Sequence, residues 1–227
     1  MFITGDIHGY FDIGKLNSRR FPLGRSLTKS DYVLIAGDFG LVWDNKKDEL
    51  FWRKWLSKKC FTTLFIDGNH ENHELLDSYP IEIWNGGKIH RINDSIIHLM
   101  RGQVFNLNGK KVFTFGGAAS HDKPYRKENV SWWPRELPSH EEYMEGLLNL
   151  ERNQWKVDLV VTHTCPSSTI NELQDIVSYP IEVDELHMYL EKIKLQLSYN
   201  NWFFGHFHND RKLSNDLTLL YNKMVEI

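Results

Sequence analysis

The sequence predicts an α/β fold whose sheets contain both parallel and antiparallel strands. One observation is a series of continuous apolar runs, which is typical of buried parallel strands. A second is that stretches with helical periodicity lie between these runs. A third is a group of successive short strands in the middle of the chain, which adds antiparallel members.

The apolar runs are short, and each is followed by a polar turn. They cover residues 1–4, 32–36, 62–66, 159–162 and 202–204. In α/β folds, ligands bind where the strands end, because the connecting loops meet at that edge of the sheet. We therefore expect the polar residues that follow these runs to converge on one cleft.

Three amphipathic helices are expected between the strands. The first covers residues 44–58 and the third covers 182–197. The second opens after Pro138 with Ser139 and Glu142, which have the spacing of a capping box. The apolar faces of the three helices are expected to be Leu50, Phe51, Trp52 and Trp55, then Tyr143, Leu147 and Leu150, and finally Leu186, Leu190, Ile193 and Leu197.

Four short strands are expected in the middle of the chain, over residues 89–92, 95–100, 103–107 and 110–115. Asn108-Gly109 separates the last two, and this dipeptide is typical of a two-residue hairpin with a type I′ turn. Hairpins join antiparallel strands, so the sheets are expected to be mixed rather than purely parallel.

The turns after the apolar runs carry side chains that bind metals. They offer two carboxylates, one carboxamide and five imidazoles, from Asp6, His8, Asp38, Asn69, His70, His163, His206 and His208. This set of oxygen and nitrogen donors suits Mn, Fe, Zn, Ni or Co better than Ca or Mg. Without His70, seven donors remain, too many for one tetrahedral ion. They would serve two ions about 3.5–4 Å apart, bridged by one carboxylate and a hydroxide.

The same turns form an ordered series of motifs that resembles the calcineurin-like metallophosphoesterase superfamily. The motifs are Gly5-Asp6-Ile7-His8, Gly37-Asp38, Gly68-Asn69-His70-Glu71, Thr162-His163 and Gly205-His206-Phe207-His208. The chain looks most like small bacterial and phage-type members. The resemblance implies an αββα sandwich, in which two mixed β-sheets are flanked by helices. We expect residues 1–227 to form one such domain.

The resemblance also implies a role for each residue of the site. The first metal would be held by Asp6, His8, Asp38 and His208. Asp38 would bridge to a second metal, which Asn69, His163 and His206 complete. His70 would stand beside the phosphate without binding metal, so the catalytic residues would be His70 and Asp38. Manganese is the favoured metal.

We therefore expect a metal-dependent phosphoric ester hydrolase that prefers phosphodiesters, a nucleotide-like ester among the candidates. A hydroxide bridging the two ions would attack phosphorus. His70 would protonate the leaving group or stabilise the transition state, and Glu71 would fix the orientation of an imidazole. The alternatives are a phosphomonoesterase or nuclease of the same fold, and a non-catalytic scaffold that binds proteins.

The expected substrate contacts are Asn69, His70 and three residues of the segment 116–126, namely His121, Lys123 and Arg126. Small residues at the start of this segment allow close approach, and its two cations could meet phosphate oxygens. The alternative is an ordinary polar surface loop. Trp132 and Trp133 follow soon after, and they would either stack on a base or sugar or pack against the protein.

The composition indicates a compact enzyme without a general nucleic-acid surface. The chain has 227 residues, 41% of them hydrophobic, and a formal charge of −3. That charge argues against a broad basic face.

The two cysteines, Cys60 and Cys165, make a disulfide framework improbable and favour a reducing compartment. Met1 begins an expected strand and no apolar run is long enough to span a membrane, so we expect neither a signal peptide nor a membrane anchor. The expected location is the cytoplasm.

Overall fold

The computed structural model describes residues 1–214 and 216–227. The strands are β1 (Phe2–Thr4), β2 (Tyr32–Ile35), β3 (Thr62–Phe65), β4 (Ile81–Trp84), β5 (Gly87–Asn93), β6 (Ile96–Leu99), β7 (Gln103–Leu107), β8 (Lys110–Phe115), β9 (Leu159–Thr162), β10 (Asn201–Phe204), β11 (Arg211–Lys212), β12 (Leu217–Leu219) and β13 (Met224–Glu226). The helices are α1 (Lys47–Ser57), α2 (His73–Asp77), α3 (His140–Arg152), α4 (Ile170–Gln174) and α5 (Glu185–Gln196). Short 3-10 helices cover Ile13–Leu16, Pro22–Arg25, Lys123–Tyr125, Pro134–Glu136 and Ser167–Thr169.

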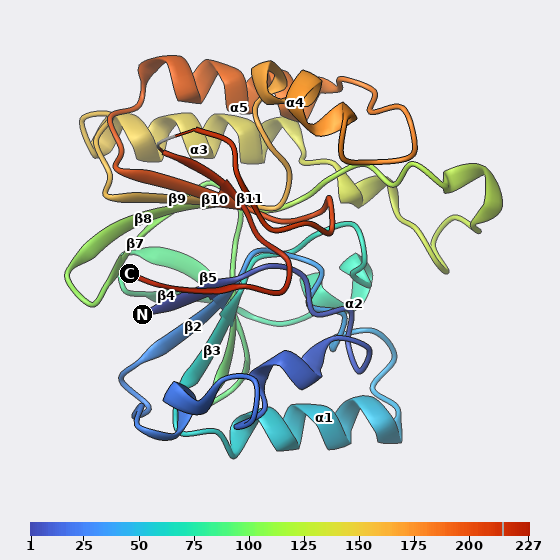
Figure 1. Cartoon of the computed structure of the whole chain (residues 1–227), viewed down its shortest axis with the longest axis vertical. Coiled ribbons are helices and arrows are strands. Elements are labelled where there is room, and N and C mark those ends of the chain that lie inside the picture. The colour runs from blue at the N-terminus through green and yellow to red at the C-terminus, as the bar shows by residue number, and fades with distance from the viewer. Residues whose placement is uncertain (215) are drawn as a thin grey trace.

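Two sheets pack face to face, with helices on their outer sides (Figure 1). The first has seven strands in the order β13-β1-β2-β3-β6-β5-β4, and the second has six in the order β11-β12-β10-β9-β8-β7. Helix α1 lies outside the first sheet, whereas α3 and α5 lie outside the second (Figure 1). The expected sandwich of two mixed sheets flanked by helices is therefore confirmed.

Both sheets combine parallel and antiparallel pairs. In the first sheet, β1, β2, β3 and β6 run parallel, while β5 pairs antiparallel with β6. The hairpin β7–β8 belongs to the second sheet. Asn108 (φ 51°) and Gly109 (φ 79°) both have the left-handed backbone that a type I′ turn requires. The hairpin predicted from this dipeptide is thus confirmed.

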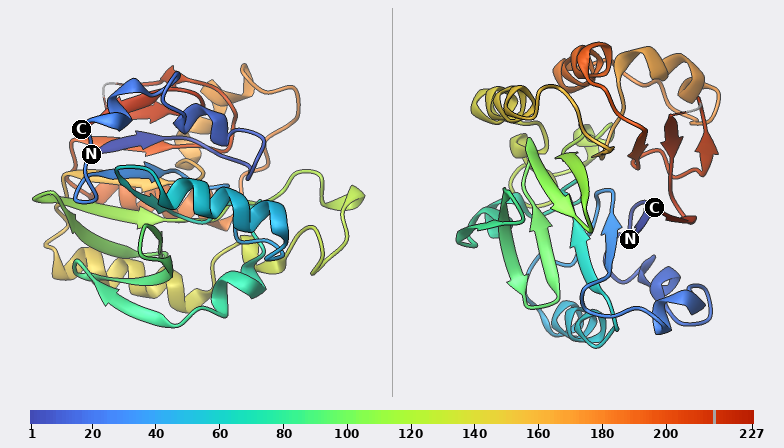
Figure 2. Two further views of the ribbon diagram at one scale, coloured as in Figure 1. Left: turned by 90° about the horizontal axis from the view of Figure 1, so that it is seen from below. Right: turned by 90° about the vertical axis from the view of Figure 1, so that its left-hand side faces the viewer.

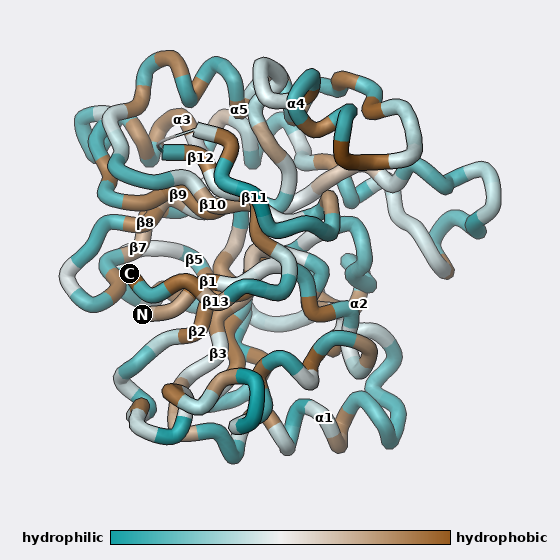
Figure 3. Tube along the Cα trace, in the orientation of Figure 1, coloured by the Kyte–Doolittle hydropathy of each residue, from teal (hydrophilic) through white to brown (hydrophobic). Residues whose placement is uncertain are grey.

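Each buried strand contributes side chains to two hydrophobic cores, one on each face of its sheet, because successive side chains point to opposite sides. In β2, Val33 and Ile35 pack with Leu56 of α1, whereas Leu34 packs between the two sheets against Leu159 of β9. Figure 3 shows the hydrophobic residues gathered along the central strands of both sheets. Because both faces of these strands are buried, their sequences are continuous apolar runs.

The three predicted helices correspond to α1, α3 and α5, whereas the short helices α2 and α4 were not predicted. Helix α1 also differs in its buried face. The capping box of Ser139 and Glu142 is formed at the start of α3. Helix α1, in contrast, leaves Leu50 and Phe51 exposed. Its inner face instead includes Glu49, which accepts hydrogen bonds from the backbone of residues 43–45 and pairs with Arg53. The prediction of an apolar face through Leu50 and Phe51 was wrong, since this helix supports a loop through ionic groups.

The chain ends meet at one edge of the first sheet. Strand β13 pairs antiparallel with β1, so the two termini lie side by side (Figure 2). Cys60 is exposed and Cys165 is buried, and both are free thiols. Among the helices of residues 1–214 and 216–227, none has the length and apolar character needed to cross a membrane.

Candidate metal and active site

The predicted metal ligands lie just beyond the carboxyl ends of parallel strands. Asp6 follows β1, Asp38 follows β2 and Asn69 follows β3, all in the first sheet. His163 follows β9 and His206 follows β10, in the second sheet. Because the sheets pack face to face, these turns meet, and the expected convergence on one site is what the structure shows.

Four of the predicted ligands form a compact cluster. One ligand atom from each of Asp6, His8, Asp38 and His208 lies within 4.8 Å of the others. His8 Nε2 is 3.3 Å from Asp38 Oδ2, and His208 Nε2 is 3.3 Å from Asp6 Oδ2. His8 Nε2 and Asp38 Oδ2 are buried and have no hydrogen-bond partner among the described residues. Such groups are costly when unpaired, so their placement fits a shared cation.

A second group of donors faces the other oxygen of Asp38. His163 Nε2 lies 3.2 Å from Asp38 Oδ1 and 3.3 Å from Asn69 Oδ1. The ring of His206 stands beside that of His163, with their centroids 5.1 Å apart. The backbone N–H of His206 donates to both carboxylate oxygens of Asp6, at 3.1 and 3.2 Å. Asp38 thus stands between two donor groups and turns one oxygen to each.

The electrostatics of the site favour added positive charge. Burial alone would lower the pKa of His8, but the nearby carboxylate of Asp38 raises it to about 9. At His163, burial would also lower the pKa, but the charge of Asp38 raises it to about 10. Burial holds the pKa of His206 well below its usual value, and His163 adds to this effect. The carboxylates therefore keep protons on two rings, in a field that would equally attract a divalent cation.

Polar contacts on the side away from the cluster fix the orientation of two candidate ligands, His8 and His163. His8 Nδ1 lies 2.8 Å from Asp12 Oδ2, which also accepts a hydrogen bond from the Tyr221 hydroxyl at 3.2 Å. His163 Nδ1 lies 2.8 Å from the carbonyl oxygen of Ala36. In each case the other ring nitrogen points toward the cluster. Groups that hydrogen-bond to metal ligands commonly orient them in this way. Asp12 was missed from the sequence, although it lies four residues after His8, beside the first motif.

Glu71 has a different role from the one expected. Its buried carboxylate accepts from the backbone N–H of Phe39 at 2.7 Å and from that of Gly40 at 3.3 Å. Burial and the charge of Asp38 hold the pKa of Glu71 well above its usual value. In the described structure, the side chain thus fixes the turn that carries Asp38 rather than an imidazole.

Asn69 is oriented by two residues that the sequence did not indicate. Its Nδ2 donates to Ser120 Oγ at 3.1 Å, and Ser120 Oγ donates to Glu136 Oε1 at 2.9 Å. Both Ser120 and Glu136 are buried. With its amide nitrogen engaged in this way, Asn69 presents its oxygen to His163. Ser120 belongs to the segment of small residues noted above, whereas Glu136 had no sequence signal.

The backbone of the site is strained and tightly packed. His8, Asp38, His206 and His208 have φ values of 46°, 47°, 71° and 46°. Left-handed backbone at such residues costs about 1–3 kcal/mol each and is found chiefly at functional sites. A Cβ at Gly205 would lie 2.1 Å from Asp6 Oδ1. Only glycine therefore allows the turn after β10 to approach the carboxylate of Asp6.

His70 lies at the edge of the site and contacts Arg126. Its backbone N–H donates to Asp38 Oδ1 at 2.7 Å, and an Arg126 guanidinium nitrogen lies 3.1 Å from its Nε2. A guanidinium can only donate, so Nε2 accepts and the ring is neutral. Burial lowers the pKa of His70; Asp38 partly opposes this, and the charge of Arg126 lowers it further.

The other expected substrate contacts, His121 and Lys123, precede Arg126 in the same segment. Lys123 Nζ is 3.6 Å from the buried Glu136 carboxylate and 5.0 Å from the ring centre of Trp132. His121 is exposed and stacks on Tyr179, with centroids 3.9 Å apart. Trp133 is buried against Trp43, which matches the packing alternative. Of the three residues expected from residues 116–126, the structure brings Arg126 to His70 but gives Lys123 and His121 other partners.

The fold is of the two-sheet α/β class, and a candidate metal cluster lies at the ends of its strands. The model of the calcineurin-like phosphoesterase family matches residues 1–210. The chain belongs to that family, and it is a metal-dependent phosphoric ester hydrolase. Its family implies divalent metal ions and phosphate-ester substrates, and Asp6, His8, Asp38 and His208 form a candidate metal site.

The chain also aligns with solved structures. Phosphopantetheinyl hydrolase from Mycobacterium tuberculosis is 16% identical to this chain and aligns with a TM-score of 0.47. The alignment covers 97% of this chain and 87% of the other. The search of curated proteins found no match.

Proposed function

We propose that the protein is a dinuclear metal-dependent phosphoesterase that prefers phosphodiesters. The observation that carries this proposal is the position of Asp38, whose two oxygens face separate donor groups at 3.3 and 3.2 Å. Asp6, His8 and His208 would complete one ion site with Asp38. Asn69, His163 and His206 would complete the other. Two bound metal ions would supply an activated water and neutralise charge on the phosphate.

The charges around the site support a diester substrate. Arg126 is paired with Asp122 at 2.8 Å, and Lys123 is paired with Glu136 at 3.6 Å. Both cations are therefore partly neutralised before a substrate arrives. A diester carries one negative charge and needs less compensation than a dianionic monoester. We propose that Arg126 turns from His70 to a phosphate oxygen, which frees His70 Nε2 to take up a proton from solvent and then deliver it to the leaving group.

The proposal extends to the metal, the domain and the compartment. Manganese is favoured among Mn, Fe, Zn, Ni and Co, since the donors mix carboxylate and imidazole without thiolate. Residues 1–227 are proposed as one domain, because the site draws residues from both sheets. The free, exposed thiol of Cys60 supports a reducing compartment such as the cytoplasm.

A panel of esters tests the reaction. With Mn²⁺ added, bis(p-nitrophenyl) phosphate should be hydrolysed with a higher kcat/KM than p-nitrophenyl phosphate or a short DNA strand. A higher value for the monoester or the DNA would favour the alternative phosphomonoesterase or nuclease. Failure to hydrolyse any ester with any of the five metals would favour the non-catalytic scaffold.

Metal analysis tests the dinuclear arrangement. Asp38→Ala should lose both ions together, because it is proposed to hold both. Asp94→Ala, which removes an exposed carboxylate in a turn, serves as the control and should retain two ions per chain. Full metal content in the Asp38→Ala protein would rule out the bridging role.

A further inference from the structure

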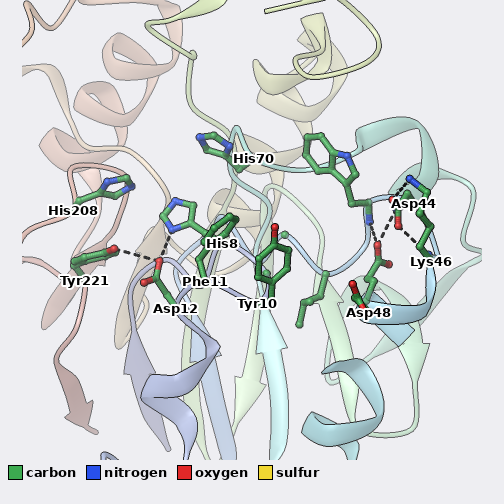
Figure 4. Close-up of a pocket in the computed structure, with 15 residues that line it drawn as sticks. His8, Tyr10, Phe11, Asp12, Asp44, Lys46, Asp48, His70, His208 and Tyr221 are labelled. Carbon is green, nitrogen blue, oxygen red and sulfur yellow. Dashed lines mark hydrogen bonds and ion pairs between the residues drawn. The ribbon is translucent and has the colours of Figure 1, made fainter. Parts of the chain in front are cut away.

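A wide groove opens beside the candidate metal site. It has a volume of about 720 Å³ and is lined by His8, His70 and His208 at one end. From there it runs between residues 8–12 and residues 40–49 (Figure 4). A phosphate held at the metal site would direct one of its ester groups into this groove. The volume lies within the range of pockets that enclose a small organic molecule.

The walls of the groove are aromatic and partly exposed. Tyr10 and Phe11 are 58% and 74% exposed, and their ring centroids lie 4.3 Å apart. Leu41 and Trp43 line the groove from the other loop, and Trp43 is braced by Trp133 at 5.2 Å. Exposed aromatic residues that gather at the mouth of a catalytic site are typical of ligand contact rather than of core packing.

The far end of the groove is acidic. Asp44, Asp48 and Lys46 lie there, with Tyr10 between them and His8 (Figure 4). Lys46 is paired with Asp44 at 2.7 Å. Asp48 is exposed and takes part in no hydrogen bond or ion pair among the described side chains. Neither Arg126 nor Lys123 lines the groove. The groove therefore offers no unpaired cation to a second anion.

We propose that this groove binds the organic group of the substrate, and that it selects an uncharged group with an aromatic or apolar surface. A group that carries a further phosphate would be repelled by the acidic end. The inference rests on the proposed phosphoesterase function, and it names the class of ester that the site would accept. It excludes a nucleic-acid strand, whose next phosphate would enter the groove.

Two esters with the same leaving group test the aromatic wall. Phenyl p-nitrophenyl phosphate should have a KM about tenfold below that of methyl p-nitrophenyl phosphate, because stacking on an aromatic side chain contributes on this scale. Phe11→Ala and Tyr10→Ala should each raise KM for the phenyl ester about fivefold, and that for the methyl ester much less. Leu195→Ala, at a side chain 77% exposed on α5, is the matched control and should change neither value.

A third ester tests the acidic end. A diester whose phenyl group carries an additional phosphate should be a poorer substrate than the plain phenyl ester. Asp48→Asn should raise its kcat/KM severalfold without a similar gain for the plain ester. A phosphorylated ester that is hydrolysed as well as the plain one would contradict the selection against a second anion.

Direct binding separates this inference from the proposed reaction. Calorimetry should show that Mn²⁺-loaded protein binds phenylphosphonate more tightly than methylphosphonate, and that Phe11→Ala removes most of the difference. If esters are hydrolysed but the variants change neither KM nor phenylphosphonate binding, the groove assignment is wrong and the phosphoesterase stands. If no ester is hydrolysed, the proposed function is wrong, while the effect of Phe11→Ala on binding still decides whether the groove takes an aromatic group.

Discussion

The turns that carry the proposed metal ligands are short and mostly buried, whereas the segment from residue 116 to 136 is long and exposed through much of its length. Each ligand turn leaves the end of a strand whose place is fixed by its neighbours in the sheet. The segment 116–136 projects from the body of the molecule instead, and it is visible on the right of Figure 1. Arg126 returns from its exposed part to His70, whereas Ser120, near its buried start, contacts Asn69.

The difference fits the proposed roles, in which the strand ends position the metals and the exposed loop contacts the substrate. Ligands that must be held within fractions of an ångström sit on the rigid ends of strands. Contacts to a variable substrate come from loops, which can change without disturbing the sheets. Changes in the ligand turns should therefore cost far more than changes at Lys123 and Arg126, in the exposed part of the segment 116–136.

The largest effect is expected for Gly205→Ala. The added Cβ would lie 2.1 Å from Asp6 Oδ1 and 2.8 Å from the backbone oxygen of Ala36, so the turn or the carboxylate must move. A displacement of about 1 Å costs on the order of 10²-fold in rate. Gly14→Ala is the control, since its Cβ would meet no atom closer than 4.0 Å. Metal content and kcat/KM should fall in the first variant alone, and equal behaviour of the two would contradict the close-approach argument.

The next effect is expected for His70→Ala. Both ions should remain bound, because His70 is not a proposed ligand. Activity on an aryl diester should be largely retained, whereas alkyl esters should lose on the order of 10²-fold, the range of a missing general acid. Rates on leaving groups of graded pKa would show a steeper dependence in the variant. Equal losses across that series would leave His70 with an electrostatic role only.

A more selective loss is expected for Ser120→Ala. Without the hydroxyl, Asn69 would no longer be held with its oxygen toward His163. Affinity for the second ion should fall about 10- to 100-fold, as is usual when a group behind a ligand is removed. The first ion should bind normally. Metal titration would show two unequal steps in place of near-equal ones, while the exposed Ser30→Ala control should leave the titration unchanged.

In the segment 116–136, effects on KM are expected to be smaller and to differ between the two cations. Arg126→Ala should raise KM about tenfold with less effect on kcat, because a charged hydrogen bond to phosphate is lost. Lys123→Ala should change KM less than about twofold, since this ammonium is already paired with Glu136 at 3.6 Å. Steady-state kinetics on one diester are sufficient. The reverse order would mean that Lys123 leaves Glu136 to bind the substrate.

The smallest signal is a release of protons on metal binding. The pKa values of about 9 for His8 and about 10 for His163 mean that both rings are protonated at pH 7 in the metal-free protein. Both must lose their protons to bind metal, so loading should release about two protons per chain at pH 7 and fewer above pH 9. Apparent metal affinity should accordingly rise with pH. Calorimetry in buffers of different ionisation enthalpy measures the release, and a value of zero would contradict this protonation state.

Features that are local in the chain could be predicted from the sequence, whereas contacts between distant segments could not. The convergence of Asp6, His8, Asp38 and His163 could be predicted because each follows a strand end directly in the chain. The capping box of Ser139 and Glu142 is local in the same way. Ser120 and Glu136 were not found, because Ser120 meets Asn69 across 51 residues. The exposure of Leu50 and Phe51 was missed for a related reason: periodicity identifies a helix without stating which ionic contacts occupy its inner face. The short pairing of β13 with β1 joins opposite ends of the chain and leaves no local pattern.

The hydrogen bond from His206 to Asp6 joins residues that are 200 positions apart in the chain. During synthesis, the first proposed ligand leaves the ribosome long before the last two are made. Closing so large a loop is slow and entropically costly, so the site should be among the last parts of the protein to form. A growing chain would therefore pass through most of its synthesis without a complete cage for two ions. Metal capture would mark the end of folding, and incomplete chains would be spared a reactive centre.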